Sequence, residues 1–241
     1  MTSTLASERT KTPSTPQDTD AKSADTAFGW FEQFRDVPIF LLVLIAVYAL
    51  IEASLVAGDL DLIDAPRFRS TVYEFGGFWP GILGDWQPNY PAQPWLMFLT
   101  YGFLHSGPVH LIVNMITLAS IGPIVFYRVG WWKFLMIYSA AILGGAAGFA
   151  LLSDSFRPMV GASGALFGLA GAILAWEYVD RFSLSERLWP VLRAVLFLIG
   201  LNVVLYFAMD RLLAWEAHLG GFVAGWIMAN LVDPRSRVPE E

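Results

Sequence analysis

The chain has 241 residues, of which 56% are hydrophobic and only 15% are charged, and it contains 10 Trp and 18 Phe. Soluble domains usually carry about 25% charged residues, so this composition argues against a water-soluble enzyme and predicts a polytopic membrane protein. The net charge of −6 argues against a nucleic-acid-binding surface. Because there is no cysteine, the chain has no disulfide, thiolate metal site or cysteine nucleophile.

Six apolar stretches follow a polar first segment, and each is near the length that crosses a bilayer. Residues 1–36 are rich in Thr, Ser, Asp and Lys and lack the apolar core of a signal peptide, so we expect a disordered cytoplasmic tail. We therefore predict an all-α fold, with a six-span bundle over residues 37–233 and a cytoplasmic tail over 234–241. The predicted spans cover residues 37–57, 109–127, 134–152, 159–176, 194–209 and 217–232.

The distribution of basic residues predicts how these spans are oriented. With the N-terminus inside, eleven of the 15 Lys and Arg residues fall in cytoplasmic segments and four fall in outer segments. Cytoplasmic segments carry the excess of Lys and Arg, so we expect both termini inside and spans two, four and six to begin at the outer face. The connection over 58–108 is rich in aromatic residues, and we expect it to lie in the outer interface as an anchor.

Four polar residues lie near the outer ends of spans two, four and six, where polar side chains are costly. His110 and Asn114 are four residues apart, which puts both on one helix face. Ser163 lies about one turn into span four, roughly 6 Å from its start, and His218 is near the start of span six. The topology therefore predicts that residues from three distant segments meet in one shallow layer.

This grouping is typical of a serine nucleophile with its base. A serine hydroxyl is a weak nucleophile until a neighbouring histidine takes its proton, which suits Ser163 and His218. Acyl transfer also needs donors for the developing oxyanion, and His110, Asn114 and the Ser163 N–H can supply them. Since no Asp or Glu lies at this depth, and Glu216 should point away, we expect a dyad and not a triad.

Simpler interpretations exist for each residue taken alone. Glycines in a membrane helix, such as Gly161, usually allow close helix packing. Asn114 alone would be an interhelical hydrogen-bonding residue, and His218 a polar residue on a packing face. A metal site of His105, His110 and His218 is not expected, because the first two do not share a helix face and no acidic or thiolate ligand joins them.

Together, these motifs resemble the rhomboid family of intramembrane serine proteases over about residues 37–233. The family's second-span motif is matched by His105-Ser-Gly-Pro-Val-His110-Leu-Ile-Val-Asn114, its nucleophile motif by Gly161-Ala-Ser163-Gly164, and its last-span motif by Ala217-His218-Leu-Gly-Gly221-Phe-Val-Ala-Gly225. The resemblance implies a six-transmembrane-helix rhomboid-like bundle of the form common in bacteria. It therefore implies the bacterial inner (plasma) membrane, with the active site toward the outer face.

The resemblance also implies a role for each residue of the site. Ser163 would be the nucleophile and His218 the base. The oxyanion hole would be formed by His110, Asn114 and the Ser163 N–H, with Gly161 shaping the approach to it.

Two further residues have implied positions around this site. Phe167 is one turn after Ser163 on the same face, where many relatives carry Tyr, and we expect its ring to stack on His218 and hold its orientation. His105 matches a family histidine at the mouth of the site and is expected to be structural.

Members of the family cleave transmembrane protein substrates near the end of a helix. The resemblance therefore implies an intramembrane serine endopeptidase that acts in the lipid bilayer without a cofactor or metal. Span five and the loop 210–216, which includes Leu212, Leu213 and Trp215, would act as gate and cap. Helix-destabilising residues in the substrate would expose its peptide bond, since a formed helix hides its backbone.

Two other functions stay open from the sequence. A rhomboid-like non-catalytic protein would bind membrane clients, although inactive relatives typically lose the serine or the histidine, and this chain keeps both. A transporter has less support, because no paired charges or broken mid-membrane helices are visible. The long first loop also lacks the Trp-Arg pair of many relatives, and Phe126 precedes Tyr127 and Arg128 where many relatives carry an acidic residue. The oligomeric state is open.

Overall fold

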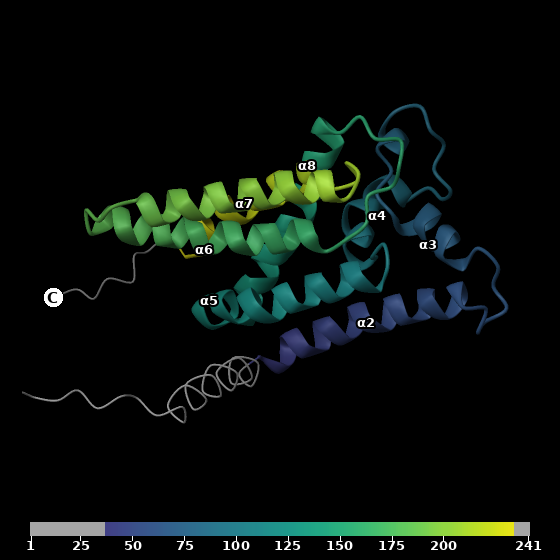
Figure 1. Ribbon diagram of the computed structural model, residues 1–241, viewed down its shortest axis with the longest axis horizontal. Helices are drawn as coiled ribbons and strands as arrows, with labels where there is room; N and C mark the ends of the chain where they lie inside the picture. Colours follow the sequence, from purple (N-terminus) through teal and green to yellow (C-terminus); the bar gives the residue numbers. More distant parts are fainter. Residues whose placement is uncertain (1–36, 234–241) are drawn as a thin grey trace, which may run out of the picture. The chain divides into compact units, whose positions relative to one another are not determined.

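The computed structural model describes residues 37–233, and the predicted tails 1–36 and 234–241 lie outside the described residues (Figure 1). The described part is helical, with one isolated antiparallel bridge between Phe78 and Met159 and no strand. Its α-helices are α2 (Ile39–Asp59), α3 (Phe68–Gly76), α4 (Gln93–Thr100), α5 (Pro108–Leu152), α6 (Ser163–Ser183), α7 (Trp189–Ala208) and α8 (Trp215–Val232). Two short 3₁₀ helices, η1 (Pro80–Leu83) and η2 (Tyr101–Phe103), lie on either side of α4.

Three of these helices, α2, α5 and α7, are long and apolar enough to cross a membrane by length and composition. Helices α6 and α8 interrupt their apolar residues with glycines and with polar side chains such as Glu177 and His218, so their composition alone does not mark them as spans. The apolar helices are those of a multi-pass membrane protein, and the count of six spans stays a prediction.

Helix α5 contains the predicted second and third spans. Its 45 residues are interrupted at Gly130, where φ is 79° and ψ is 171°. A positive φ of this size favours glycine, because a side chain there would crowd its own backbone. The interruption falls inside the predicted connection 128–133, so the two halves of α5 correspond to the two predicted apolar stretches.

The predicted start of the fourth stretch is wrong. Residues 159–162 do not belong to the helix: Phe78 and Met159 exchange two backbone hydrogen bonds of 3.0 and 2.9 Å, and Gly161 has a φ of 134°. Helix α6 therefore begins at Ser163 and continues to Ser183. Ser163 is thus the first residue of its helix and not one turn inside it.

Helix α7 also begins earlier than predicted, at Trp189 and not at residue 194. Pro190 lies in its first turn. Proline fits there because a backbone N–H at that position would have no intrahelical acceptor, so its absence costs no hydrogen bond. The charged side chain of Arg193, outside the predicted span 194–209, therefore belongs to the first turns of the helix.

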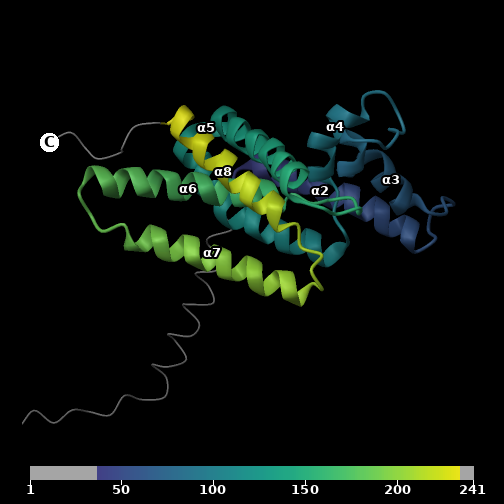
Figure 2. The same ribbon diagram turned by 90° about the horizontal axis from the view of Figure 1, so that it is seen from above.

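Helices α5, α6 and α8 form the centre of the bundle, and glycines let their backbones approach (Figure 2). A Cβ placed on Gly221 of α8 would collide with the carbonyl oxygen of Gly164 of α6, and a Cβ on Gly225 would collide with that of Gly168. On the other side of α8, a Cβ on Gly220 would meet the backbone of α5. Small residues at a crossing allow close packing in lipid, where the hydrophobic effect does not drive helices together.

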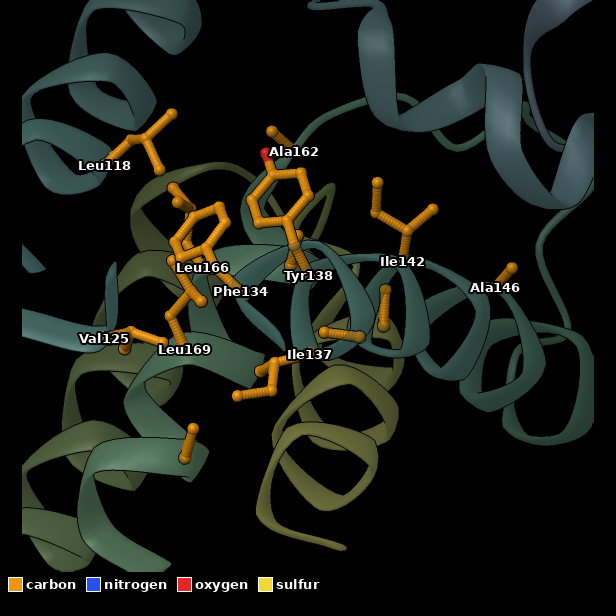
Figure 3. Close-up of a cluster of buried hydrophobic side chains, with 14 of the residues drawn as sticks. Leu118, Val125, Phe134, Ile137, Tyr138, Ile142, Ala146, Ala162, Leu166 and Leu169 are labelled. Atoms are coloured by element: carbon orange, nitrogen blue, oxygen red, sulfur yellow. The ribbon is translucent and has the colours of Figure 1, made fainter. Parts of the chain in front are cut away.

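Larger apolar side chains fill the space beside these crossings (Figure 3). They come mainly from the two halves of α5 and from α6, and several are fully buried. The buried set includes Leu118, Val125, Phe134, Ile137, Ile142, Leu166 and Leu169. This packed interior fixes the starts of α5, α6 and α8, which carry His110, Ser163 and His218.

Helix α7 lies beside α6, at the edge of the bundle (Figure 2). Val191 is the only residue of α7 that is buried. Its other side chains are largely apolar and exposed, as at Phe197, which is 67% exposed. Such a surface suits lipid, and α7 is attached to the rest of the bundle far more loosely than α8.

The segment between α2 and α5 is folded and tied down by Arg69 of α3. The Arg69 guanidinium contacts the carboxylate of Glu52 at 2.8 Å and that of Asp59 at 2.7 Å, both on α2. It also donates to the backbone oxygen of His105, 3.2 Å away. Glu52 is only 2% exposed, and a buried carboxylate requires such a partner. Arg69 thus supplies an ion pair in a loop that lacks the Trp-Arg pair of many relatives.

A second ionic cluster joins the end of the first half of α5 to the far ends of α6 and α8. Arg128 of α5 contacts Asp180 of α6 at 3.5 Å and Asp233, just after α8, at 3.1 Å. Its guanidinium carbon lies 4.5 Å from the ring centroid of Trp176, a cation–π distance. The cluster clamps the helix ends opposite to the one where Ser163 lies.

Candidate active site

Ser163 and His218 lie within hydrogen-bond distance of each other. The Nε2 atom of His218 is 2.8 Å from the Oγ atom of Ser163. The two residues come from the starts of α6 and α8. The close backbone contact of Gly164, next to Ser163, with Gly221, three residues after His218, keeps these starts together. His218 is only 4% exposed. Oγ is therefore held beside an imidazole nitrogen in a largely dry environment.

The ring of Phe167 covers one face of this imidazole. The ring centroids of Phe167 and His218 are 4.2 Å apart and the planes are inclined by 9°, which is a stacked arrangement. Phe167 follows Ser163 by one helical turn, so both side chains of α6 approach His218 from the same side. The stacking restricts rotation of the imidazole out of its plane.

The other nitrogen of His218 contacts Asn202 of α7, which the sequence analysis missed. The Nδ1 atom of His218 is 2.6 Å from the Oδ1 atom of Asn202. A triad was not predicted from the sequence, because no Asp or Glu lies at the depth of Ser163 and an amide was not considered as the partner of His218. The available signal was that Asn202 is the only amide or charged side chain between Val195 and Ala208.

His110, near the start of α5, packs directly on the backbone of Gly161. A Cβ at Gly161 would be only 2.7 Å from Cε1 of the His110 ring, so close contact and the φ of 134° both require glycine. Ser106 is on the other side of the ring: its Oγ is 3.0 Å and its backbone nitrogen 3.4 Å from Nδ1 of His110. The Ser106 N–H points to Nδ1 as a donor, which favours the His110 tautomer with its hydrogen on Nε2.

Two further donors come from α5 and from the start of α6. Asn114 is 4% exposed, and its Nδ2 atom has no hydrogen-bond partner among residues 37–233. A buried amide nitrogen without an acceptor is unfavourable unless a ligand atom supplies one. The backbone N–H of Ser163, in the first turn of α6, has no intrahelical acceptor either.

The loop before α6 is held by the segment that precedes α5. The backbone N–H of Gly161 donates to the carbonyl oxygen of Tyr101, 3.1 Å away, and the buried Tyr101 hydroxyl donates to the carbonyl oxygen of Ile142. Together with the Phe78–Met159 bridge, these bonds fix the approach to Ser163 from residues far away in sequence.

His105 is enclosed beside this group and is not placed to exchange protons with solvent. It is fully buried, and its ring meets those of Tyr48 and His110 edge to face, with centroids 5.5 and 5.1 Å away. Burial, with a smaller contribution from the neighbouring His110, lowers the pKa of His105 to about 3. The neutral ring is thus a packing element between α2 and α5.

A cavity of about 620 Å³ opens beside His218, between α7 and the starts of α6 and α8. Its polar lining groups are few and include Asn202 and His218, and the rest is mostly apolar. Trp215, at the start of α8, also lines it. The residues before Trp215 form a nonhelical connection in which Asp210 and Arg211 have positive φ. That connection covers residues 210–214 of the predicted cap 210–216, and Trp215 and Glu216 belong to α8.

The helices and the polar groups together describe a multi-pass membrane protein with a serine–histidine pair at one end of its core. Residues 92–235 match the family model described as the Rhomboid domain. The chain therefore belongs to the rhomboid family, and the resemblance drawn from the motifs is confirmed. The matched segment contains Ser163, His218, His110, Asn114 and Asn202.

Several curated proteins are similar to this chain. RHOMBOID-like protein 5 of Arabidopsis thaliana is 37% identical over 130 residues, which is 52% of this chain and 40% of that protein. RHOMBOID-like protein 6, mitochondrial, of the same plant is 31% identical over 158 residues, 63% of this chain and 49% of that protein. Rhomboid protease GluP of Bacillus subtilis is 35% identical over 136 residues, 56% of this chain and 25% of that protein. The matches thus span less than half the length of each of these relatives.

Proposed function

We propose that this protein is an intramembrane serine endopeptidase that hydrolyses peptide bonds in or near transmembrane segments of membrane-protein substrates. The observation that carries the proposal is the 2.8 Å contact between His218 Nε2 and Ser163 Oγ. A serine whose hydroxyl donates to a histidine nitrogen is activated for attack on a carbonyl carbon. The name of the Bacillus relative, a rhomboid protease, agrees with this chemistry.

The reaction follows from the arrangement of the pair. Ser163 Oγ attacks the carbonyl carbon of the substrate, and its proton passes to Nε2 of His218. The histidine then gives this proton to the leaving amine, and the serine becomes an ester of the remaining fragment. Water, losing a proton to the same nitrogen, hydrolyses the ester and restores the serine hydroxyl.

The negative charge that develops on the carbonyl oxygen needs donors that are already in place. We assign this role to Nε2–H of His110, the amide of Asn114 and the backbone N–H of Ser163. The absence of an acceptor for Asn114 Nδ2 among the described residues supports this assignment. The N-terminal end of α6 adds the positive end of a helix dipole.

The substrate must present an extended peptide bond, because a helix hides its backbone. The apolar cavity of about 620 Å³ beside His218 suits an apolar segment that leaves lipid to enter the site. We propose that α7 and the connection over 210–216 form the gate and cap through which it enters. The natural substrate lies among transmembrane proteins.

We also propose the membrane arrangement on which this account depends. The two halves of α5, together with α2, α6, α7 and α8, make six spans in a domain over residues 37–233, with both termini inside. The distribution of Lys and Arg along the sequence supports this orientation. It puts the starts of α6 and α8, and hence the site, toward the outer face of a bacterial inner membrane.

Cleavage of a transmembrane reporter by the full chain in liposomes tests the proposal. Ser163→Ala and His218→Ala should each lower the rate on the order of 10³-fold or more, because the nucleophile or its base is lost. Ser120→Ala is the matched control: Ser120 is on α5, and its hydroxyl bonds only the carbonyl of its own helix. Cleavage at the wild-type rate by folded Ser163→Ala would contradict the role of Ser163, and a folded wild-type chain that binds the reporter without cleaving it would favour a non-catalytic client-binding protein.

A further inference from the structure

Asn202 extends the serine–histidine pair into a chain of three side chains from three helices. We propose that Asn202 is a positioning residue that holds His218 in the tautomer with its hydrogen on Nδ1, so that Nε2 can accept the proton of Ser163. This proposal rests on the function proposed above for Ser163 and His218. It concerns a residue outside the motifs that carry that function.

The orientation of the Asn202 amide is fixed by its own helix. Its Nδ2 atom donates to the backbone oxygen of Leu198, one turn earlier, at 2.9 Å. The amide group is planar, so this bond directs Oδ1 away from the α7 backbone and toward His218. A rotation that exchanged the two atoms would lose the bond to Leu198 and set an N–H group against the imidazole.

An amide oxygen only accepts hydrogen bonds, and this decides which histidine nitrogen carries the hydrogen. The contact between Oδ1 and Nδ1, at 2.6 Å, requires a hydrogen on Nδ1. A neutral imidazole has one such hydrogen, so Nε2 is left with a lone pair facing Ser163 Oγ. In the other tautomer, two lone pairs would face each other at Nδ1, and Nε2 would no longer accept from the serine.

The burial of His218 strengthens the influence of this hydrogen bond on the tautomer. His218 is 4% exposed and stacked on Phe167, so water does not readily replace Asn202 as a partner of Nδ1. Hydrogen bonds are stronger and unpaired polar atoms more costly in such a dry environment. When His218 takes the serine proton, the dipole of the Asn202 carbonyl also stabilises the imidazolium. A neutral amide thus takes the place that a carboxylate occupies in a triad.

The bond also links the base to the position of α7. Among residues 37–233, no other side-chain hydrogen bond or ion pair joins α7 to another helix. The base is therefore fully oriented only when α7 lies against α6 and α8. A substrate that moves α7 aside would withdraw the acceptor, and its return would restore the reactive tautomer.

The chain contains only three histidines, so the ring nitrogens can be observed directly by ¹⁵N NMR of the full chain in detergent micelles or nanodiscs. The signals of His218 are identified by their loss in His218→Gln. We expect the Nδ1-protonated tautomer for His218 in the wild type. In Asn202→Leu, which keeps the size of the side chain without an acceptor, we expect the Nε2-protonated form or a mixture.

Kinetics on a transmembrane reporter give the second readout. Asn202→Leu should lower kcat about 10- to 100-fold, at or below the lower end of what general-base catalysis contributes, with little change in KM. Asn202→Asp keeps an acceptor and should recover most of the activity. Val204→Ala, on the exposed side of α7, is the matched control and should leave both quantities unchanged. Asn202→Ala serves in place of Asn202→Leu if the latter does not fold.

The outcomes separate this proposal from the proposed function. The same His218 tautomer in the wild type and in Asn202→Leu, or equal kcat for Asn202→Leu and Val204→Ala, would overturn the role of Asn202 even if Ser163→Ala is inactive. Full activity of Ser163→Ala would instead overturn the proposed function. The NMR spectrum, recorded without substrate, would still report on the contact between Asn202 and His218.

Discussion

Helices α8 and α7 both deliver a polar side chain to Ser163 or its base, yet they are held in opposite ways. Helix α8 is packed backbone to backbone between α5 and α6 through Gly220, Gly221 and Gly225. Helix α7 buries only Val191 and exposes most of its apolar side chains. One helix is fixed by contacts that cannot yield, and the other is held by a few contacts beside an apolar cavity.

The difference teaches where precision is needed in this molecule. The nucleophile and base must keep hydrogen-bond geometry, and glycine crossings in lipid give this through close packing of backbones. Helix α7 borders the cavity by which an apolar segment would arrive, and tight packing there would close it. Asn202 allows loose packing of α7 together with a precisely oriented base, because its single hydrogen bond orients His218 when α7 lies in place.

The largest expected effect on stability comes from a substitution that breaks the packing of α8. In Gly221→Ala, the added methyl group would collide with the carbonyl of Gly164, which belongs to the backbone and cannot rotate away. We expect a loss of about 3 kcal/mol or more in the free energy of unfolding, or no folded protein. Denaturation in mixed detergent micelles measures the change.

The matched variant is Gly200→Ala on α7. A Cβ at Gly200 has no heavy atom within 4 Å, so we expect a change within about 1 kcal/mol, toward higher stability through helix propensity. Equal stability losses for Gly200→Ala and Gly221→Ala would refute the contrast between the two helices.

A smaller effect is expected on the α6 side of the base. Phe167→Leu removes the stacked ring from His218 but keeps an apolar side chain. An aromatic pair contributes about 0.5–1.5 kcal/mol beyond its buried area, so kcat should fall roughly 2- to 10-fold. This loss should be smaller than that of Asn202→Leu. Phe182→Leu, at an exposed position of the same helix, is the control. A larger loss for Phe167→Leu than for Asn202→Leu would mean that stacking, and not α7, orients the base.

The sequence singled out polar residues near the starts of helices. Ser163, His218, His110 and Asn114 stood out because polar side chains are rare in apolar stretches, and the structure brings Ser163 and His218 together. Their catalytic roles stay predictions. Asn202 had the same kind of signal and was missed, because the third member was sought among carboxylates.

The parts that sequence reasoning did not reach depend on contacts between distant segments. Met159, shortly before the start of α6, pairs with Phe78, and composition does not reveal so distant a partner. The ion pair of Arg69 with Glu52 likewise joins the segment after α2 to that helix, and the apolar residues around Glu52 do not indicate which residue is its partner. Periodicity and hydropathy are local signals and cannot give such pairings.

The measurement that tests the central claim most directly is labelling of the full chain by a fluorophosphonate, with the modified residue located by mass spectrometry. This reagent phosphonylates an activated serine far faster than an ordinary one, with loss of fluoride. The account predicts modification of Ser163 alone, its loss in Ser163→Ala, and a strongly reduced rate in His218→Ala. Labelling that persists in Ser163→Ala, or that proceeds at the wild-type rate without His218, would contradict the assignment of this pair as nucleophile and base.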